Sequence, residues 1–393
     1  MFEEALKEIY AELAVIGSGP SGQKAAIQAA KLGKKVVVIE RDEHIGGASL
    51  NSGTIPSKSL REAILDLTDF YSRSFYAQDE EVSFKKISIN DLNFRLHKVL
   101  DEQRRMLGRQ FEKNHIQVVH GSARFEDEHT LHVFDDNETL AHIISAEYIL
   151  IATGSKPRNP KEVPFDKHKV LDSTRLLEID CLPKSLIVLG GGIIGSEYAS
   201  FFAALGTKVT VIDKRDQILP LLDREIGQHL QKSLSKIGLS FLGEKVFEEI
   251  VQKNGQVVVK FKDNTESSAD VLLYALGRVA NVDSLCIECA GINVTEKGFV
   301  PVNALFQTVV PSIYAVGDVI GGPALASTGM EQGRLAARHA FGVKTHHFPS
   351  FYPIGIYTIP EISSVGYTEE QLKDLEFKYE IGRAYYYEIA RNQ

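Results

Sequence analysis

The sequence has little cysteine. Only three of its 393 residues are cysteines, Cys181, Cys286 and Cys289. This odd and sparse set excludes a scaffold held together by disulfides. Cys286 and Cys289 have CxxC spacing, but a tetrahedral metal site requires two further ligands, and no candidate lies nearby in the sequence. We therefore predict no metal site.

The sequence also lacks long apolar runs and an excess of positive charge. Runs such as AVIG and VLLYALG are far shorter than the roughly 20 residues that span a bilayer. The N-terminus, MFEEALKEIYAE, is acidic and does not resemble a signal sequence. With 44 basic and 52 acidic residues, the net charge is −8, which disfavours nucleic acid and anionic membranes as partners. We predict a cytoplasmic protein of two or three domains.

What stands out instead is a strand–turn–helix unit that occurs twice. The two copies read ELAVIGSGPSGQKAAIQAAKLGKKVVVIER and SLIVLGGGIIGSEYASFFAALGTKVTVIDKR. Each contains the pattern GxGxxG and a second strand that ends in an acid, 23 residues after the first glycine. These positions are Gly17, Gly19, Gly22 and Glu40 in the first copy, and Gly190, Gly192, Gly195 and Asp213 in the second.

The chemistry of dinucleotides explains this spacing. The first glycine permits the tight turn, the second lets a pyrophosphate approach the backbone, and the third lets the helix pack on the strand. The helix N-terminus offers free N–H groups to the phosphates, and the acid accepts hydrogen bonds from a ribose diol. Two copies in the same register predict that the protein binds two dinucleotides.

Three further segments indicate that the first copy binds a flavin. The loop GGASLNSGTIPSK follows Glu40, the strand of AEYILIATGSKP runs into a turn at residues 152–154, and a strand in PSIYAVGDVIGGPALAS ends at Gly317 and Asp318. An acid at the end of a strand can bind a chain of hydroxyl groups, and backbone N–H groups can face a flavin ring.

Taken together, these segments make the chain resemble the flavoprotein disulfide reductase family, from the first glycine turn to YTIPEISSVGYTE. The resemblance implies an α/β fold with two Rossmann-like dinucleotide-binding domains, for FAD and NAD(P), and the start of an α+β dimerisation domain. We expect the FAD domain at 1–155 and 277–345, the NAD(P) domain at 156–276, and an incomplete dimerisation domain at 346–393. A helical region is expected from about 55 to 111.

Disulfide reductases carry two cysteines in a GGTCLNVGCIPSK-like loop, where this chain has Ser49 and Thr54. Hydroxyls cannot form the dithiol relay, so this loop is not expected to reduce disulfides. One branch, the soluble pyridine nucleotide transhydrogenases, is similar also in GTIPSK, RDQILPLLDREI, YAVGDVIGGPALAS and YTIPEISSVGYTEEQL. That branch replaces the second cysteine by threonine but keeps the first, so Ser49 is a departure from it.

The resemblance implies an FAD-dependent transhydrogenase that moves hydride reversibly from NADPH through flavin N5 to NAD⁺, with both nucleotides using one pocket in turn. Lys58 and Glu197 match a family pair near N5, where the cation favours reduced flavin and the acid orients the lysine. The alternative is an exposed helix lysine and a capping glutamate. Two other functions stay open: an NAD(P)H-dependent reductase, oxidase or diaphorase with another acceptor, and a flavin-binding protein without turnover.

The resemblance also implies the cofactor-binding positions. Those for FAD are Gly17, Gly19, Gly22, Glu40, Arg41, Gly46, Gly47, Ser49, Gly53, Thr54, Lys58, Ala123, Ala152, Thr153, Gly154, Arg278, Gly317, Asp318, Leu325 and Ala326. Those for the nicotinamide nucleotide are Gly190, Gly192, Ile194, Gly195, Asp213, Lys214 and Gly277. Asp213 suits the ribose diol of NAD but repels the 2′-phosphate of NADP. Lys214 and Arg215 either compensate for that repulsion or form a solvated loop.

The family also implies a homodimer, in which a C-terminal His and Glu reach the partner's active site. This chain stops at YYYEIARNQ, before that segment, and Phe348–Gln393 is only 46 residues long. Such a short segment buries too small a core to be stable alone. We expect the chain either to be a fragment or to lack this interface, which leaves the homodimer an open expectation.

Overall fold

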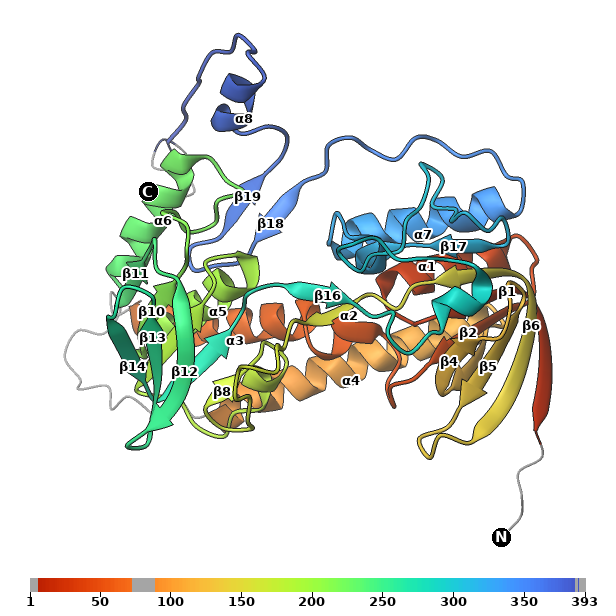
Figure 1. Ribbon diagram of the computed structural model, residues 1–393. Helices are drawn as coiled ribbons and strands as arrows, with labels where there is room; N and C mark the ends of the chain where they lie inside the picture. Colours follow the sequence, from red (N-terminus) through yellow and green to blue (C-terminus); the bar gives the residue numbers. More distant parts are fainter. Residues whose placement is uncertain (1–5, 73–88, 386–387, 389–393) are drawn as a thin grey trace.

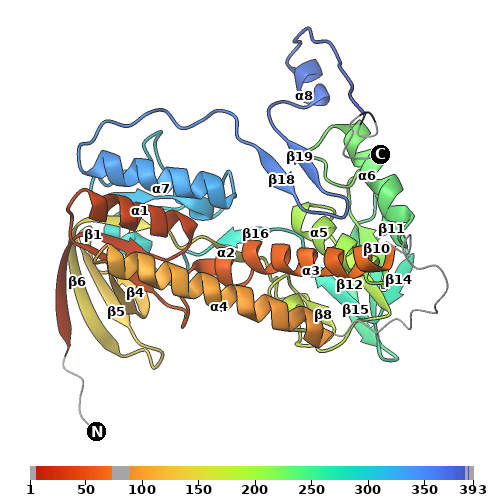
Figure 2. The same cartoon turned by 180° about the vertical axis from the view of Figure 1, so that it is seen from behind.

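The computed structural model describes residues 6–72, 89–385 and 388, and it contains two large sheets joined by long helices (Figures 1 and 2). The predicted α/β fold class is confirmed. The expected helical region consists of α3 (Thr54–Ser72) and α4 (Ile89–Lys113). The part of that region between these two helices lies outside the described residues.

The first sheet has seven strands and holds the first glycine turn. Five strands run parallel, and β4 and β5 extend the sheet in antiparallel fashion. The strands are β1 (Lys7–Ile16), β2 (Val36–Glu40), β3 (Gln117–His120), β4 (Ser122–Phe125), β5 (Thr130–Phe134), β6 (Leu140–Ile151) and β17 (Ile313–Ala315). All five residues of β2 are buried, as expected for a strand covered on both faces.

Three helices cover one face of this sheet. They are α1 (Pro20–Lys31), α4 and α7 (Ala326–Ala340), whose apolar side chains share one core with β1 and β2. Helices α1 and α7 lie side by side (Figure 1). They are so close at Gly333 that a Cβ there would lie 2.2 Å from the Ser21 carbonyl oxygen, so only glycine fits at this position.

The second sheet holds the second glycine turn and has five parallel strands. They are β8 (Val170–Leu171), β9 (Ser185–Leu189), β10 (Lys208–Ile212), β11 (Leu239–Leu242) and β15 (Val271–Tyr274). Helices α5 (Ile193–Ala204) and α6 (Arg224–Ser235) pack on one face. An antiparallel sheet of β12 (Phe247–Lys253), β13 (Gln256–Phe261) and β14 (Glu266–Ala269) covers the other.

Two short strands join these halves. The chain leaves the first sheet through β7 (Ser155–Pro157) and returns through β16 (Arg278–Ala280), and these two strands pair in antiparallel fashion. The predicted domain boundaries at 155/156 and 276/277 fall beside this pair. Short 3₁₀ helices are η2 (Arg175–Glu178), η3 (Ile287–Ala290) and η4 (Gly317–Ile320).

The C-terminal part crosses back to the second sheet. After α7, the chain runs to a hairpin of β18 (Ile354–Ile356) and β19 (Ile362–Ser364), followed by α8 (Glu369–Asp374). Figures 1 and 2 show this hairpin beside α5 and α6, far from α7. Among the described residues, no helix combines the length and apolar character needed to cross a membrane.

The third glycine of each motif fixes the contact between helix and strand. A Cβ at Gly195 would lie 1.9 Å from the Gly190 carbonyl oxygen, and one at Gly22 would lie 2.0 Å from that of Gly17. Neither helix can therefore start at its observed position with a larger residue there.

We predict that Gly195→Ala destabilises the protein, because the added carbon forces α5 away from β9. The expected loss is about 2 kcal/mol or more, seen as a lower melting temperature in thermal unfolding. Gly108→Ala is the control, since Gly108 lies within α4 and a Cβ there meets no atom within 4 Å. That control should be neutral or stabilising; equal melting temperatures for both variants would contradict the prediction.

Candidate active site

Both glycine turns line one cavity of about 1610 Å³. This volume exceeds the roughly 300–1,000 Å³ of a pocket for a single drug-sized ligand. Its wall also includes the loop after β2, the start of α3, strands β7 and β16, and residues of the C-terminal hairpin. The cavity therefore has room for more than one nucleotide.

Most of the sequence-predicted site residues line this cavity. They are Gly17, Gly19, Glu40, Arg41, Gly47, Ser49, Gly53, Thr54, Lys58, Ala123, Ala152, Thr153, Gly154, Gly190, Gly192, Ile194, Glu197, Asp213, Lys214, Gly277, Arg278, Asp318, Leu325 and Ala326. Gly22, Gly46, Gly195 and Gly317 are not part of its wall. A side chain at any of these four would collide with the residues behind it, so they shape the site from outside.

Each glycine turn presents an open helix N-terminus to the cavity. The N-caps of α1 and α5 are Gly19 and Gly192, and neither helix has a side-chain cap. A Cβ at either glycine would meet no protein atom within 4 Å, so the backbone there faces open space. Uncapped N–H groups beside such a space suit a pyrophosphate. The structure thus fits two dinucleotides.

The acid of the first motif, Glu40, is buried and held by three donors. Oε2 accepts hydrogen bonds from the backbone N–H of Ser18 (3.0 Å) and from its hydroxyl, and Oε1 accepts one from the N–H of Asp42 (3.1 Å). The Ser18 hydroxyl oxygen in turn accepts a hydrogen bond from the N–H of Gly46 (2.7 Å). This chain of bonds joins the glycine turn to the loop that leads into α2 (Gly47–Asn51) and α3.

The acid of the second motif, Asp213, is paired with a cation. Arg215 donates from Nε to Oδ1 (2.8 Å) and from Nη2 to Oδ2 (2.6 Å). The backbone N–H groups of Arg215 and Gly191 also donate to this carboxylate. Burial opposes ionisation of Asp213, but these hydrogen bonds outweigh it and hold the pKa below its ordinary value.

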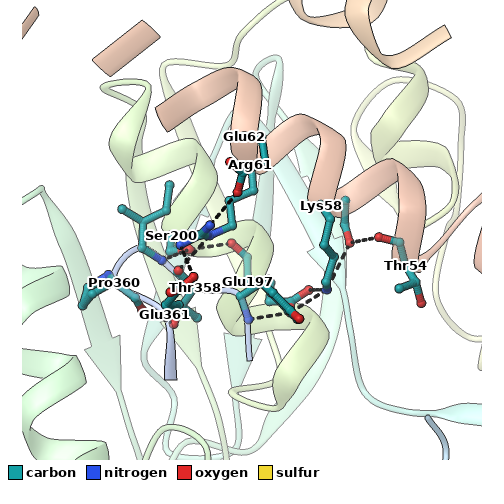
Figure 3. A network of polar contacts seen from close by, with 12 residues as sticks. Thr54, Lys58, Arg61, Glu62, Glu197, Ser200, Thr358, Pro360 and Glu361 are labelled. Atoms are coloured by element: carbon teal, nitrogen blue, oxygen red, sulfur yellow. Dashed lines mark hydrogen bonds and ion pairs between the residues drawn. The ribbon is translucent and has the colours of Figure 1, made fainter. Parts of the chain in front are cut away.

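Lys58 and Glu197 form an ion pair across two helices, α3 and α5 (Figure 3). Lys58 Nζ lies 2.9 and 3.0 Å from the two carboxylate oxygens, and Glu197 is only 4% exposed. Tyr357, in the loop between β18 and β19, completes the cluster. Its backbone N–H donates to Glu197 Oε1 (2.9 Å), and the centre of its ring lies 4.4 Å from Lys58 Nζ. The family pair expected from the sequence is therefore present as a contact, while its role stays a proposal.

Arg61 anchors the hairpin one turn further along α3 (Figure 3). It is 6% exposed, donates from Nε to the Thr358 carbonyl oxygen (3.2 Å), and pairs through Nη2 with Glu361 (2.9 Å). Ser200 of α5 accepts a hydrogen bond from the Ile359 N–H (3.1 Å). The hairpin is thus tied to both helices that carry the ion pair.

A third cluster joins the two crossover strands to η4. Arg278 donates to the hydroxyl (2.8 Å) and carbonyl oxygen (2.6 Å) of Ser155, and the Ser155 hydroxyl donates to Asp318 Oδ2 (2.6 Å). All three residues line the cavity. Burial lowers the pKa of Arg278 below its usual value.

No thiol lines the cavity. Cys181, Cys286 and Cys289 are exposed elsewhere, and the wall positions at the start of α2 and α3 are occupied by the hydroxyls of Ser49 and Thr54. In the part of the chain that the structure describes, no group of three or more His, Cys, Asp or Glu side chains could hold a metal ion.

Comparison with known proteins identifies the family. Residues 11–333 match the pyridine nucleotide-disulphide oxidoreductases, and residues 352–393 match the dimerisation domain of the same family. The chain belongs to this family. The expectation of an oxidoreductase is thereby confirmed.

Curated relatives specify the branch. The soluble pyridine nucleotide transhydrogenase of Mycobacterium tuberculosis is 45% identical over 383 residues, covering 97% of this chain and 81% of that protein. The protein of the same name from Shigella boydii is 40% identical over 380 residues, covering 96% and 81%. The resemblance to soluble transhydrogenases seen in the sequence is confirmed.

Solved structures agree on the fold. The HOCl-induced flavoprotein disulfide reductase RclA of Escherichia coli superimposes with a TM-score of 0.80 at 30% identity, covering 92% of this chain and 79% of that one. LpdA of M. tuberculosis gives a TM-score of 0.84 at 26% identity, covering 94% and 80%. The predicted flavoprotein disulfide reductase fold is confirmed.

The sequence analysis missed several residues of these networks, among them Ser18, Arg61, Ser155 and Tyr357. Ser18 stands at a variable position of GxGxxG, and Tyr357 lies within the stretch YTIPEISSVGYTE that contributed to the resemblance. Arg61 lies outside these motifs, and Ser155 lies within AEYILIATGSKP, but the contacts of neither could be read from the motifs. Thr358 is 297 residues from Arg61, and Arg278 and Asp318 are 123 and 163 residues from Ser155.

We predict that Arg61→Leu loosens the C-terminal hairpin. The change leaves the Thr358 carbonyl oxygen buried without its donor, which costs about 1–3 kcal/mol. Hydrogen exchange of the amides at 354–364 should accelerate accordingly. Glu361→Gln is the matched control: Glu361 is 64% exposed, and exposed ion pairs contribute little. Unchanged exchange in Arg61→Leu would show that the arginine does not anchor the hairpin.

Proposed function

We propose that this protein is an FAD-dependent transhydrogenase that transfers hydride between NADPH and NAD⁺. The observation that carries the proposal is the joint wall of the cavity, which contains both glycine turns and the Lys58–Glu197 pair but no thiol. Relatives that are 40–45% identical bear the name of this activity. NADPH and NAD⁺ would be its substrates.

FAD would be held by the first motif. The N-terminus of α1 faces the open space at Gly19, and Glu40 is buried at the end of β2. When bound, the flavin supplies hydride transfer. Arg278 and Asp318, which accepts a hydrogen bond from the Ser155 hydroxyl, line the same cavity and would also contact the FAD. The second motif, with Gly192 and Asp213, would hold the nicotinamide nucleotide.

Lys58 is the residue that we assign to the reaction itself. Its ammonium group stabilises negative charge that develops beside it during hydride transfer. Glu197 fixes the position of that ammonium with two oxygens, and the hydrogen bond from the Tyr357 backbone fixes Glu197. The cation is therefore pre-organised, which is the condition under which electrostatic stabilisation is most effective.

The lack of a thiol determines the order of events. A relay to an external disulfide needs a thiolate and a second sulfur, whereas Ser49 and Thr54 offer hydroxyls only. Both substrates must then use the same side of the cavity, one after the other. Because both nucleotides would bind at the second glycine turn, the second can enter only after the first has left.

Anaerobic stopped-flow spectroscopy tests the proposed function. The FAD-loaded protein is mixed with NADPH until the flavin absorbance is bleached, and NAD⁺ is then added. We expect the absorbance to recover while NADH forms. Bleaching without recovery would assign the protein to reductases with another acceptor, and a flavin that NADPH does not bleach would leave only a binding role.

We predict that Lys58→Met slows the bleaching of the flavin by NADPH by about 10²-fold, as the removal of one pre-organised stabilising group commonly does. Lys260→Met is the control, because Lys260 lies in β13, pairs with Glu249 and is not part of the cavity wall. A Lys58→Met variant that bleaches at the rate of the unchanged protein would remove Lys58 from the mechanism.

A further inference from the structure

The acids of the two motifs occupy the same register but differ in their partners. All three donors to Glu40 are neutral groups. Asp213 instead has both oxygens covered by one guanidinium, at 2.8 and 2.6 Å. A free carboxylate is what a ribose diol requires at this position. The second motif therefore presents a neutralised acid where an NAD-specific site presents a charged one.

Arg215 is not needed to hold the carboxylate in place. The backbone N–H of Gly191 donates to Oδ2 (2.7 Å), and that of Arg215 donates to Oδ1 (2.9 Å). Asp213 has a side chain only 2% exposed, whereas that of Arg215 is 44% exposed, and both residues line the cavity. Because the Asp213 carboxylate is buried, Arg215 can turn away only where the two backbone N–H groups and the hydroxyls of a bound ribose take its place as donors.

We propose that Arg215 is the residue that lets one pocket accept both NAD(H) and NADP(H), an inference that rests on the proposed function. With NADP(H), the guanidinium donates to the 2′-phosphate and keeps one bond to Asp213, which masks the repulsion between the two anions. With NAD(H), it turns away and leaves Asp213 to accept the ribose hydroxyls.

The chemistry of the guanidinium permits this bridge. Arginine has five N–H donors in a planar fork, and the bonds to Asp213 in this structure use Nε and Nη2. Nη1 makes no hydrogen bond to the described residues and is left for a phosphate oxygen. A further cation stands in the wall, the exposed Lys214, whose charge adds to that of Arg215 against a dianionic phosphate. The ammonium of Lys245, also in the wall, is already paired with Asp263.

Calorimetric titration of the FAD-loaded protein with two fragments tests this assignment. AMP carries the ribose diol, and adenosine 2′,5′-bisphosphate carries the 2′-phosphate, so their difference reports on this contact alone. We predict that Arg215→Ala weakens binding of the bisphosphate by roughly tenfold or more, the effect of a lost charge-assisted hydrogen-bond pair, and leaves AMP within about twofold. Asp213→Asn should act in the opposite sense, weakening AMP and strengthening the bisphosphate.

Arg224→Ala is the matched control. Arg224 also forms an ion pair with an aspartate, Asp216 (2.9 Å), but it lies on α6 outside the cavity wall. The affinities of Arg224→Ala for both fragments should equal those of the unchanged protein. Arg215→Lys keeps the charge without the planar fork and should fall between the unchanged protein and Arg215→Ala. These variants and Asp213→Asn test the assignment even if Arg215→Ala proves unstable in thermal unfolding.

Equal losses for both fragments in Arg215→Ala, or no loss for the bisphosphate, would overturn the assignment. So would an unchanged protein that does not bind the bisphosphate. The proposed function fails separately: a protein that shows the expected shifts in binding but no recovery of flavin absorbance with NAD⁺ would retain the Arg215 assignment and lose transhydrogenation.

Discussion

The ion pair between Lys58 and Glu197 is the constraint on which the site depends. Glu197 is 4% exposed, and a buried carboxylate is stable only with a partner and further hydrogen bonds. Lys58 from α3 and the Tyr357 backbone N–H supply them. Meeting this single requirement brings together a helix that begins at the flavin loop, a helix that begins at the second glycine turn, and the C-terminal hairpin. The contacts that position Lys58 in the site are therefore also contacts that hold these three segments together.

The two glycine motifs share their backbone geometry and differ in the partners of their acids. In both, the third glycine admits the helix to within contact of the first glycine's carbonyl oxygen, and in both the N-cap glycine leaves the helix end open. The difference lies at the acid. Glu40 is bonded to Ser18, which also holds the backbone at Gly46, so the first motif is joined to the next loop. Asp213 has its own cation two residues away, and the second motif stays exposed on that side. A fixed environment suits a resident cofactor, and an adjustable one suits substrates that exchange.

Much of this could be predicted from local patterns. A glycine turn, its helix and its acid all fall within about 25 residues, where spacing alone conveys the geometry. The loop from Gly46 to Lys58 is also informative by itself, because hydroxyl residues at positions 49 and 54 cannot form a dithiol relay. The exact bounds of the domains and the roles of the individual residues remain predictions.

Local sequence therefore determined the fold class, and it predicted two dinucleotides and the absence of a dithiol relay, since each depends on residues that are close along the chain. Only the tertiary structure decided which side chains meet. Lys58 and Glu197 are 139 residues apart, and Arg61 and Thr358 are 297 apart. Arg215 is only two residues from Asp213, but the sequence around it is compatible with a solvated loop as well as with an ion pair. The folded backbone directs its guanidinium toward the carboxylate. Contacts of this kind depend on the direction of each side chain after folding, which neither composition nor spacing specifies.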